Sequence, residues 1–352
     1  MVDWTKSMQQ TFEYYIVDPN TWTDVKKLDN VKSSSISRDL DADTLGSASI
    51  DITESVGECY IRIYLITIQN GITEKHPLGT FLVQTPSSNF NGKIRNVTMD
   101  AYTPLIELKE KQPPIGYSIL EGSNILENAY LITSGNLRAP VVKTECPEVI
   151  KGDFVANDGD TWITFNNDLL ANAKHKYDLD ELGRVLFSPI QDTASLQPVW
   201  TYNDDNSSIL HPDIDMTHDL YKIPNVVEVI YSSGRVNHHV RIVNDDVNSP
   251  TSTVNREREI VHREINPNMN GTPTYDQVKE YAERLLKELS SFEYTVSYKH
   301  GYCPVRVGDC VRLNYTRAGI TDVKAKVISQ QITCKPGCEV EEKAVFTTKL
   351  WR

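Results

Sequence analysis

The stretch from Thr272 to Leu350 constrains the fold most, because the spacing of its apolar residues changes from helical to alternating at Phe292. Before that point the apolar residues fall at i, i+3, i+4, i+7, i+8 and i+11, and this pattern predicts one amphipathic helix; they are Val278, Tyr281, Ala282, Leu285, Leu286 and Leu289. The helix can start at Thr272 followed by Pro273, or at Thr274, with Gln277 completing a capping box. Two acid-first pairs, Glu280 with Arg284 and Glu283 with Lys287, favour the same helix.

After the helix the chain reads as a series of strands. Phe292, Tyr294, Val296 and Tyr298 alternate with polar residues, which predicts a half-buried strand. A second run continues from Cys303 to Tyr315, with a tight corner at Gly308-Asp309. Pro336 and Gly337 suit the two central positions of a type II turn, so a final hairpin is expected around them.

The chain has 352 residues, so we expect two to four domains. Apolar residues make up 39% and charged residues 24%, which is typical of a folded protein. The sequence contains no run of 18 apolar residues, so no transmembrane helix is expected. The first residues lack the apolar segment of a signal peptide, so we expect folding in a cytosol and cysteines that stay reduced.

The net charge is −12, which argues against a nucleic-acid-binding surface, because such surfaces need clustered Lys and Arg. It allows a passive conduit for DNA, where an acidic wall avoids sticking to phosphate. The simpler interpretation is an acidic protein with no DNA-related role.

The first 103 residues predict five or six antiparallel strands in a small barrel or sandwich. Tyr60–Ile68 is apolar on nearly both faces and should be central, whereas the polar residues 24–46 read as a surface loop. Asn70-Gly71 and Asn91-Gly92 predict hairpins. Pro104 and Pro113-Pro114 place a domain boundary near residue 115.

A mixed α/β domain is expected next. Helices are predicted over about 123–133 and 161–173, with an extended segment at 140–150 between them. Asp180–Gly183 is a turn that leads into a strand at 184–187. Residues 211–219 read as a loop, 223–231 as a central strand, 236–242 as its returning partner and 257–265 as an extended run.

Motifs for chemistry are absent, and we predict no catalytic, cofactor-binding or metal-binding residue and no enzyme activity. Cys303, Cys310, Cys334 and Cys338 have spacings unlike those of zinc ribbons. The carboxylates of 39–43 and 213–219 do not fit a calcium loop. His238 and His239 should face opposite sides of a strand, and His262 with Glu264 lacks a second histidine.

Several segments, in this order, resemble the tail hub proteins at the base of the bacteriophage tail tube. The segments that show the resemblance are Leu78–Val83, Asp180–Phe187, Asp219–Tyr231, the helix of 272–291 that leads into the last strands, and Val307-Gly308-Asp309. The resemblance covers most of the chain. It implies a β-rich α+β protein with two tail-tube-like β-barrel domains and an inserted mixed α/β domain. The implied limits are 1–115 for the first barrel, 116–215 with 250–300 for the α/β domain, and 216–249 with 301–352 for the second barrel.

The resemblance also implies a structural virion protein of the tail tip or baseplate, assembled in the bacterial host cytoplasm. Such a hub closes the distal end of the tail tube as a homotrimer, adapts a sixfold tube to a threefold tip and forms part of the DNA conduit, touching DNA only in passing. Expected partners are the distal tail or tail tube protein, the tape measure protein and a central spike or fibre protein, without membrane insertion. Because the sequence ends at Trp351-Arg352, just after the last predicted strand, we expect any lytic or receptor-binding part to be a separate protein.

Two other classes of function stay open on the sequence alone. A carbohydrate-binding β module would explain the tyrosines and short strands, but it does not predict the helix of 272–291. A tail-associated peptidoglycan hydrolase or peptidase would need a catalytic constellation that the motifs do not supply.

Overall fold

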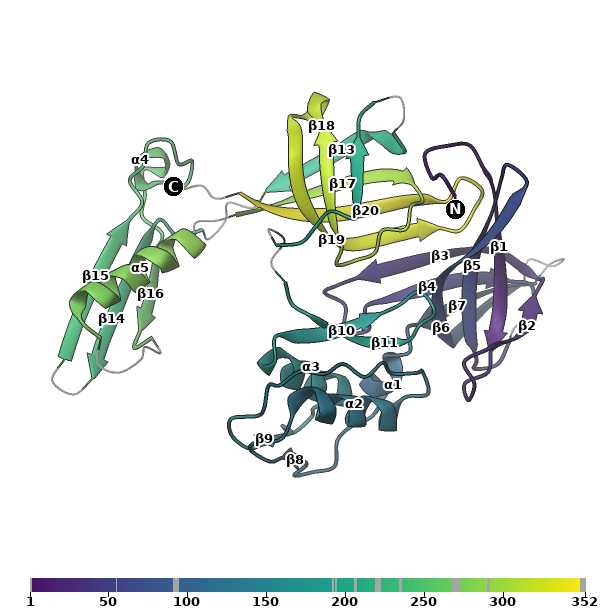
Figure 1. Cartoon of the computed structure of the whole chain (residues 1–352), viewed down its shortest axis with the longest axis horizontal. Coiled ribbons are helices and arrows are strands. Elements are labelled where there is room, and N and C mark those ends of the chain that lie inside the picture. The colour runs from purple at the N-terminus through teal and green to yellow at the C-terminus, as the bar shows by residue number, and fades with distance from the viewer. Residues whose placement is uncertain are drawn as a thin grey trace. The chain divides into compact units, whose positions relative to one another are not determined.

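The computed structural model describes residues 2–54, 56–90, 95–191, 193, 195–205, 208–218, 223–233, 236–267, 273–289 and 292–348. The chain divides into two compact units (Figure 1). The first unit holds Met1–Ile214 and Tyr298–Lys343, and the second holds Asp215–Ser297 and Ala344–Arg352. The predicted Asn91-Gly92 turn, the Thr272 cap and residues 219–222 lie outside the described residues.

Seven antiparallel strands from the first hundred residues form one part of a large sheet. They are β1 Gln9–Val17, β2 Asp24–Leu28, β3 Val31–Asp39, β4 Gly46–Ile52, β5 Tyr60–Gln69, β6 Ile72–Phe90 and β7 Arg95–Tyr102. Their spatial order is β3-β4-β7-β6-β5-β1-β2. The predicted central strand is confirmed, because β5 pairs with β1 on one side and β6 on the other. Asn70 (φ 52°) and Gly71 (φ 78°) form the predicted turn, both in the left-handed region that a type I′ hairpin requires.

Strands from the end of the chain continue the same sheet. β19 Ile320–Thr333 pairs with β3, so that Thr333 lies opposite Ser35. Beyond it the order runs to β20 Glu339–Thr348, β17 Phe292–Gly301 and β13 Leu210–His218, while β18 Cys310–Tyr315 pairs with β19 and with β12 Trp200–Asn203. A single-turn 3-10 helix, η1 Thr316–Ala318, precedes β19. The final hairpin has the predicted turn: the Cys338 N–H donates to the Lys335 carbonyl at 2.8 Å, and Gly337 has φ +96°.

The sheet core explains why these segments are strands. Alternate residues of β3, β4, β5, β6 and β7 point into one apolar cluster, which β19 and β20 complete; its fully buried members include Ile36, Ile50, Ile63, Leu65, Met99, Ile332 and Val340. Inward and outward alternation is what a sheet packed on one face requires. The predicted β-rich α+β class is therefore confirmed.

Helices and short strands between residues 106 and 189 pack into a second core of the first unit. They are α1 Ile106–Glu110, β8 Ser118–Ile119, α2 Ile125–Asn136, β9 Phe154–Val155, α3 Trp162–Asn172, β10 His175–Leu179 and β11 Val185–Pro189. Both predicted helices are confirmed. Asn124 caps α2 by accepting the Glu127 N–H, and Thr161 with Thr164 forms a capping box on α3. The predicted turn at 180–183 joins β10 and β11, with Gly183 at φ +75°.

The second unit is a three-stranded sheet with one helix packed on it. Its elements are β14 Val226–Ser233, β15 Val236–Val243, α4 Thr253–Arg256, β16 Val261–Ile265 and α5 Tyr275–Leu289. β14 is central as predicted, between antiparallel β15 and parallel β16. Val278, Ala282 and Leu286 of α5 are fully buried against Val227, Val229 and Val240. The helix starts at the second predicted position, because Thr274 and Gln277 exchange both capping-box hydrogen bonds.

Four expectations differ from the structure. Residues 24–46 are not a loop but contain β2 and β3, since β3 gains backbone partners on both sides and buries Ser34 and Ile36 alternately. Of the residues 211–219, those up to 218 are not a loop either, because 210–218 form β13. The described strands of the large sheet follow a path with two ends, and no pairing among them closes it into a barrel. β14 and β15, expected in a second barrel with 301–352, pair instead with each other and β16. The predicted domain limits themselves stay predictions.

Candidate functional site

The histidines and acids singled out in the sequence do not come together in the structure. His211 lies on β13 with its Nδ1 3.5 Å from Glu339. His238 and His239 point to opposite faces of β15, with His238 half-buried and His239 exposed. His262 and Glu264 are on β16, where Glu264 accepts a hydrogen bond from Tyr281 at 2.7 Å. Within the described ranges, no group of three or more His, Cys, Asp or Glu residues has the geometry of a metal site.

The four cysteines considered as zinc ligands lie in three different surroundings. Cys334 and Cys338 are buried in the apolar core of the large sheet beside Tyr302. Burial raises the pKa of the Cys334 thiol to about 11, and the pKa of Cys338 is also raised by burial, so both stay protonated thiols at neutral pH. Cys303 belongs to a buried polar network, and Cys310 is a buried residue at the start of β18.

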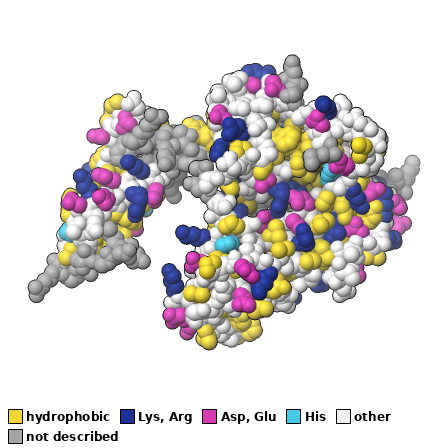
Figure 2. Space-filling model, viewed as in Figure 1, with side chains coloured by type: hydrophobic (Ala, Val, Ile, Leu, Met, Phe, Trp, Pro, Cys, Tyr) yellow, Lys and Arg dark blue, Asp and Glu magenta, His cyan; other side chains and the backbone are white. Residues whose placement is uncertain are grey.

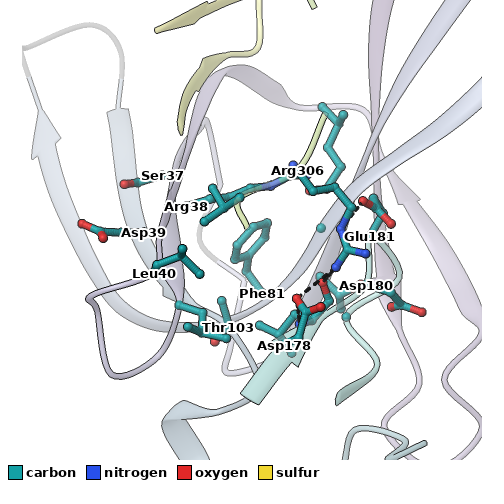
Figure 3. A pocket seen from close by; sticks show the side chains of 17 residues that line it. Ser37, Arg38, Asp39, Leu40, Phe81, Thr103, Asp178, Asp180, Glu181 and Arg306 are labelled. Atoms are coloured by element: carbon teal, nitrogen blue, oxygen red, sulfur yellow. Dashed lines mark hydrogen bonds and ion pairs between the residues drawn. The ribbon is translucent and has the colours of Figure 1, made fainter. Parts of the chain in front are cut away.

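A small cavity marks the place where three distant parts of the chain meet. The first part is the N-terminal sheet, through the end of β3 and the middle of β6; the second is the β10–β11 hairpin, and the third is the loop at 306–307. Leu40, Leu45, Leu78 and Phe81 form its apolar side, and Arg38, Asp178, Glu181 and Arg306 are among its charged lining residues. Figure 3 shows Arg306 reaching toward Asp178 and Glu181. The cavity volume of about 60 Å³ is far below the several hundred Å³ of ligand pockets, so this is a junction rather than a ligand site.

Arg306 holds the junction together. Its Nε lies 2.9 Å from Glu181 Oε1, its Nη2 lies 3.1 Å from Asp178 Oδ1, and the same nitrogen donates to the Leu179 carbonyl. Burial opposes the charge of the guanidinium, but the surrounding carboxylates outweigh it and raise the pKa of Arg306. Arg306 therefore lies between the Asp180–Gly183 turn and the Val307-Gly308-Asp309 corner. Both belong to the segments that resemble the tail hub proteins.

The carbonyl of Leu182 in the same turn is a second point of attachment. It accepts hydrogen bonds from Trp22 Nε1 at 2.8 Å, Thr80 Oγ1 at 2.9 Å and Arg62 Nη2 at 3.3 Å. The next residue, Gly183, packs closely against Thr80: a Cβ added to Gly183 would lie 2.7 Å from the Cβ of Thr80. Three donors from β5, β6 and the β1–β2 turn therefore fix the helical part of the first unit to its large sheet.

A buried ionic network lies inside the last strands. Glu342 on β20 and His300 on β17 are both 0% exposed, with Oε2 and Nε2 3.4 Å apart. The carboxylate also accepts from Gln330 Nε2 at 2.7 Å and from the Tyr298 hydroxyl. Burial lowers the pKa of His300, but Cys303 and Glu342 outweigh it and raise that pKa to about 10, so the imidazole of His300 is protonated at neutral pH.

The network has the residue types of a Cys-His-acid constellation without access to a substrate. Cys303 Sγ is 4.0 Å from His300 Nδ1, and the Cys303 residue is only 2% exposed. No sequence motif marks this cluster, since its members are spread over 43 residues of chain. One signal was present: His300 continues the alternation of Val296 and Tyr298, the buried face of β17.

Solved structures share the fold over nearly the whole chain. The tail protein from Neisseria meningitidis MC58 matches with a TM-score of 0.65 over 97% of this chain and 98% of its own, at 13% sequence identity. The 43 kDa tail protein of prophage MuSo2 from Shewanella oneidensis matches with a TM-score of 0.62 over 95% and 98%, at 9% identity. A prophage tail protein from Listeria monocytogenes EGD-e matches with a TM-score of 0.51 over 96% and 95%, at 12% identity. No family model and no curated protein sequence matches.

The fold is therefore that of phage tail proteins, and the resemblance seen in the sequence is confirmed at that level. In the part of the chain that the structure describes, no helix is long and apolar enough to cross a membrane.

Proposed function

We propose that the chain is a structural protein of a bacteriophage tail, and that within the tail it is the baseplate hub at the distal end of the tube. The observation that carries the proposal is the length of the structural match: 97% of this chain aligns with 98% of a tail protein. A match over both whole chains relates the complete arrangement of elements, including the separate sheet and helix of the second unit, rather than one common domain.

The hub would act as a homotrimer in the virion, with the distal tail or tube protein, the tape measure protein and a spike or fibre protein as neighbours. Three identical chains close a ring through heterologous contacts, in which different patches of each chain meet. The open path of the large sheet supports this, because β2 and β13 stand at its two ends among the described strands and offer edges to neighbouring subunits. Lys26 and Lys27 on β2 are the type of residue that keeps an edge strand from pairing indiscriminately.

The hub would also form part of the passage for DNA. A net charge of −12 suits a channel through which phosphates slip without being held. It would carry no enzyme activity, because the cluster of Cys303, His300 and Glu342, which combines a thiol, an imidazole and a carboxylate, is buried within the strands. Zymography on peptidoglycan and a casein assay should both be blank, and clearing that survives repurification would contradict this part.

A reconstruction of the assembled particle tests the proposal. We expect three copies of the chain on the tail axis, directly below the tube. Six copies around the axis, or a place away from it, would contradict the hub assignment. A channel wall rich in Lys and Arg would leave the hub assignment intact and refute the conduit.

A further inference from the structure

Two paired segments of the first unit carry a group of exposed apolar side chains. Residues 114–125 and 146–157 run antiparallel: Ser118 pairs with Val155, Asn124 bridges to Val149, and the Gly122 N–H donates to the Ile150 carbonyl at 2.8 Å. We call these two segments the outer ribbon. Its inner face is buried on the core of α2 and α3, through Ile119, Ile125 and Ile150.

Both segments of the outer ribbon leave large apolar side chains in solvent. The exposed fractions are 106% for Ile115, 67% for Leu120, 53% for Val155 and 44% for Val149. Val155 lies opposite Ser118, so the two side chains point to the same side of the ladder, away from the buried Ile119. Single exposed apolar residues are ordinary, but several on one paired ribbon are typical of a surface that another molecule covers.

Carboxylates lie on the same two segments as these apolar side chains. Glu121, Glu148 and Asp153 are exposed on the same two segments, against one exposed lysine, Lys151. No ion pair is formed by these three carboxylates within the described residues, although Asp153 accepts the Glu121 N–H at 3.0 Å. Figure 2 shows acidic and hydrophobic side chains together over the part of the first unit where Figure 1 labels β8 and β9.

The negative charge of the outer ribbon indicates which kind of partner can bind there. Covering unpaired carboxylates with a neutral or acidic surface would desolvate them without compensation. Two outer ribbons facing each other would bring like charges together, and the chain as a whole is acidic, at −12. We propose that the outer ribbon binds a segment of a different tail protein that carries apolar side chains flanked by Lys or Arg. This inference rests on the proposed function, since it places the chain in a tail.

Photo-crosslinking in assembled tail particles tests the inference. A chain with p-benzoylphenylalanine in place of Leu120 is expected to crosslink to a Lys- or Arg-bearing segment of another tail protein, which mass spectrometry of the adduct identifies. Glu121→Lys with Glu148→Lys should lower the yield of that adduct about tenfold, because the reversed charges repel the partner. The matched control, Asp29→Lys with Glu54→Lys, changes two exposed carboxylates outside the outer ribbon and should leave the yield unchanged.

Each other outcome has a defined meaning. An adduct with a second copy of this chain, no adduct in particles that contain the chain, or a yield insensitive to the ribbon charges would overturn the inference and leave the proposed function standing. Particles that lack the chain altogether would refute the proposed function, and the inference with it. Unchanged tryptophan fluorescence of each purified variant confirms that the substitutions leave the fold intact.

Discussion

The substitution Glu342→Gln is expected to destabilise the first unit strongly, because it leaves the imidazolium of His300 buried without its counter-charge. Both side chains are 0% exposed, and the carboxylate is the charged group that the imidazole faces at 3.4 Å. Removing one partner of a buried ion pair typically costs about 3–5 kcal/mol, since the remaining charge must either stay unpaired or give up its proton.

The raised pKa of His300 leads to a similar magnitude. In the folded protein the pKa is about 10, against 6.5 for the unfolded chain. Since a tenfold change in proton affinity corresponds to about 1.36 kcal/mol, holding the proton at pH 7 stabilises the fold by on the order of 4 kcal/mol. If the variant lets His300 become neutral, the loss at pH 7 is of that order and no larger.

The dependence on pH has a definite sign. Because the folded pKa lies above the unfolded one, the stabilisation is complete below pH 6.5, falls through the window from 6.5 to 10 and is absent above 10. The free energy of unfolding of the unsubstituted protein should therefore decline across this window. The difference between it and the Glu342→Gln variant should shrink toward zero near pH 10.

Urea unfolding followed by tryptophan fluorescence measures this difference. Four of the five tryptophans lie in the first unit, and the fifth, Trp351, belongs to the second. The matched control is Glu341→Gln, an exposed neighbour 3.6 Å from Lys299, which should cost less than about 1 kcal/mol. Adding His300→Gln to Glu342→Gln should recover stability, because both buried charges are then gone.

The reasoning is refuted if Glu342→Gln and Glu341→Gln lose the same stability at pH 7. It is also refuted if the difference between the unsubstituted protein and Glu342→Gln does not change between pH 7 and pH 10, since His300 would then not be the group that holds the proton.

Three further predictions concern the junction, the thiols and metal content. Gly183→Ala should lower the free energy of unfolding by about 1–3 kcal/mol, because the residue has φ +75° and a new Cβ would contact Thr80. The control Gly159→Ala, at φ +88° with open space around it, should show only the smaller backbone cost. Equal losses in urea unfolding would contradict the close approach of Gly183 to Thr80. Under native conditions a thiol reagent should modify the half-exposed Cys59 and Cys146 first and the buried Cys303, Cys310, Cys334 and Cys338 only on unfolding, so rapid modification of all six thiols would disprove the burial. Elemental analysis of protein purified without chelator should find well under one zinc per chain, and a stoichiometric amount would make those four buried cysteines the first suspects.

Local patterns were sufficient for the elements whose own residues determine them. Helix α5 could be predicted from its apolar stripe and capping box, and the Lys335–Cys338 turn could be predicted from Pro336 and Gly337. The strand β3 could not be recognised in this way, because its serines give no apolar alternation. Its partners β4 and β19 supply hydrogen bonds on both sides, and β19 is far away in sequence.

The functional features depended even more on distant contacts. Neither Arg306 nor Leu182 stands out in the sequence, since each matters through partners more than a hundred residues away. The His300–Glu342 pair is similar: each residue occupies a buried position of its strand, but only the pairing of the strands brings the two charges together. The outer ribbon could not be recognised because its apolar residues belong to two segments that show no common period.

The pairing of β3 with β19 also sets the timing of folding during synthesis. Ser35 and Thr333 are partners, so one edge of β3 has no strand beside it until roughly 300 more residues have been translated. At about 5–20 residues per second, this interval is on the order of 15–60 seconds. During that time a ribosome-bound chain exposes the unpaired edge of β3. A chain whose synthesis stops before β19 keeps this edge exposed, where it can pair with other chains. Only a fully translated subunit has this edge closed, which keeps incomplete copies from presenting the finished surface to an assembling particle.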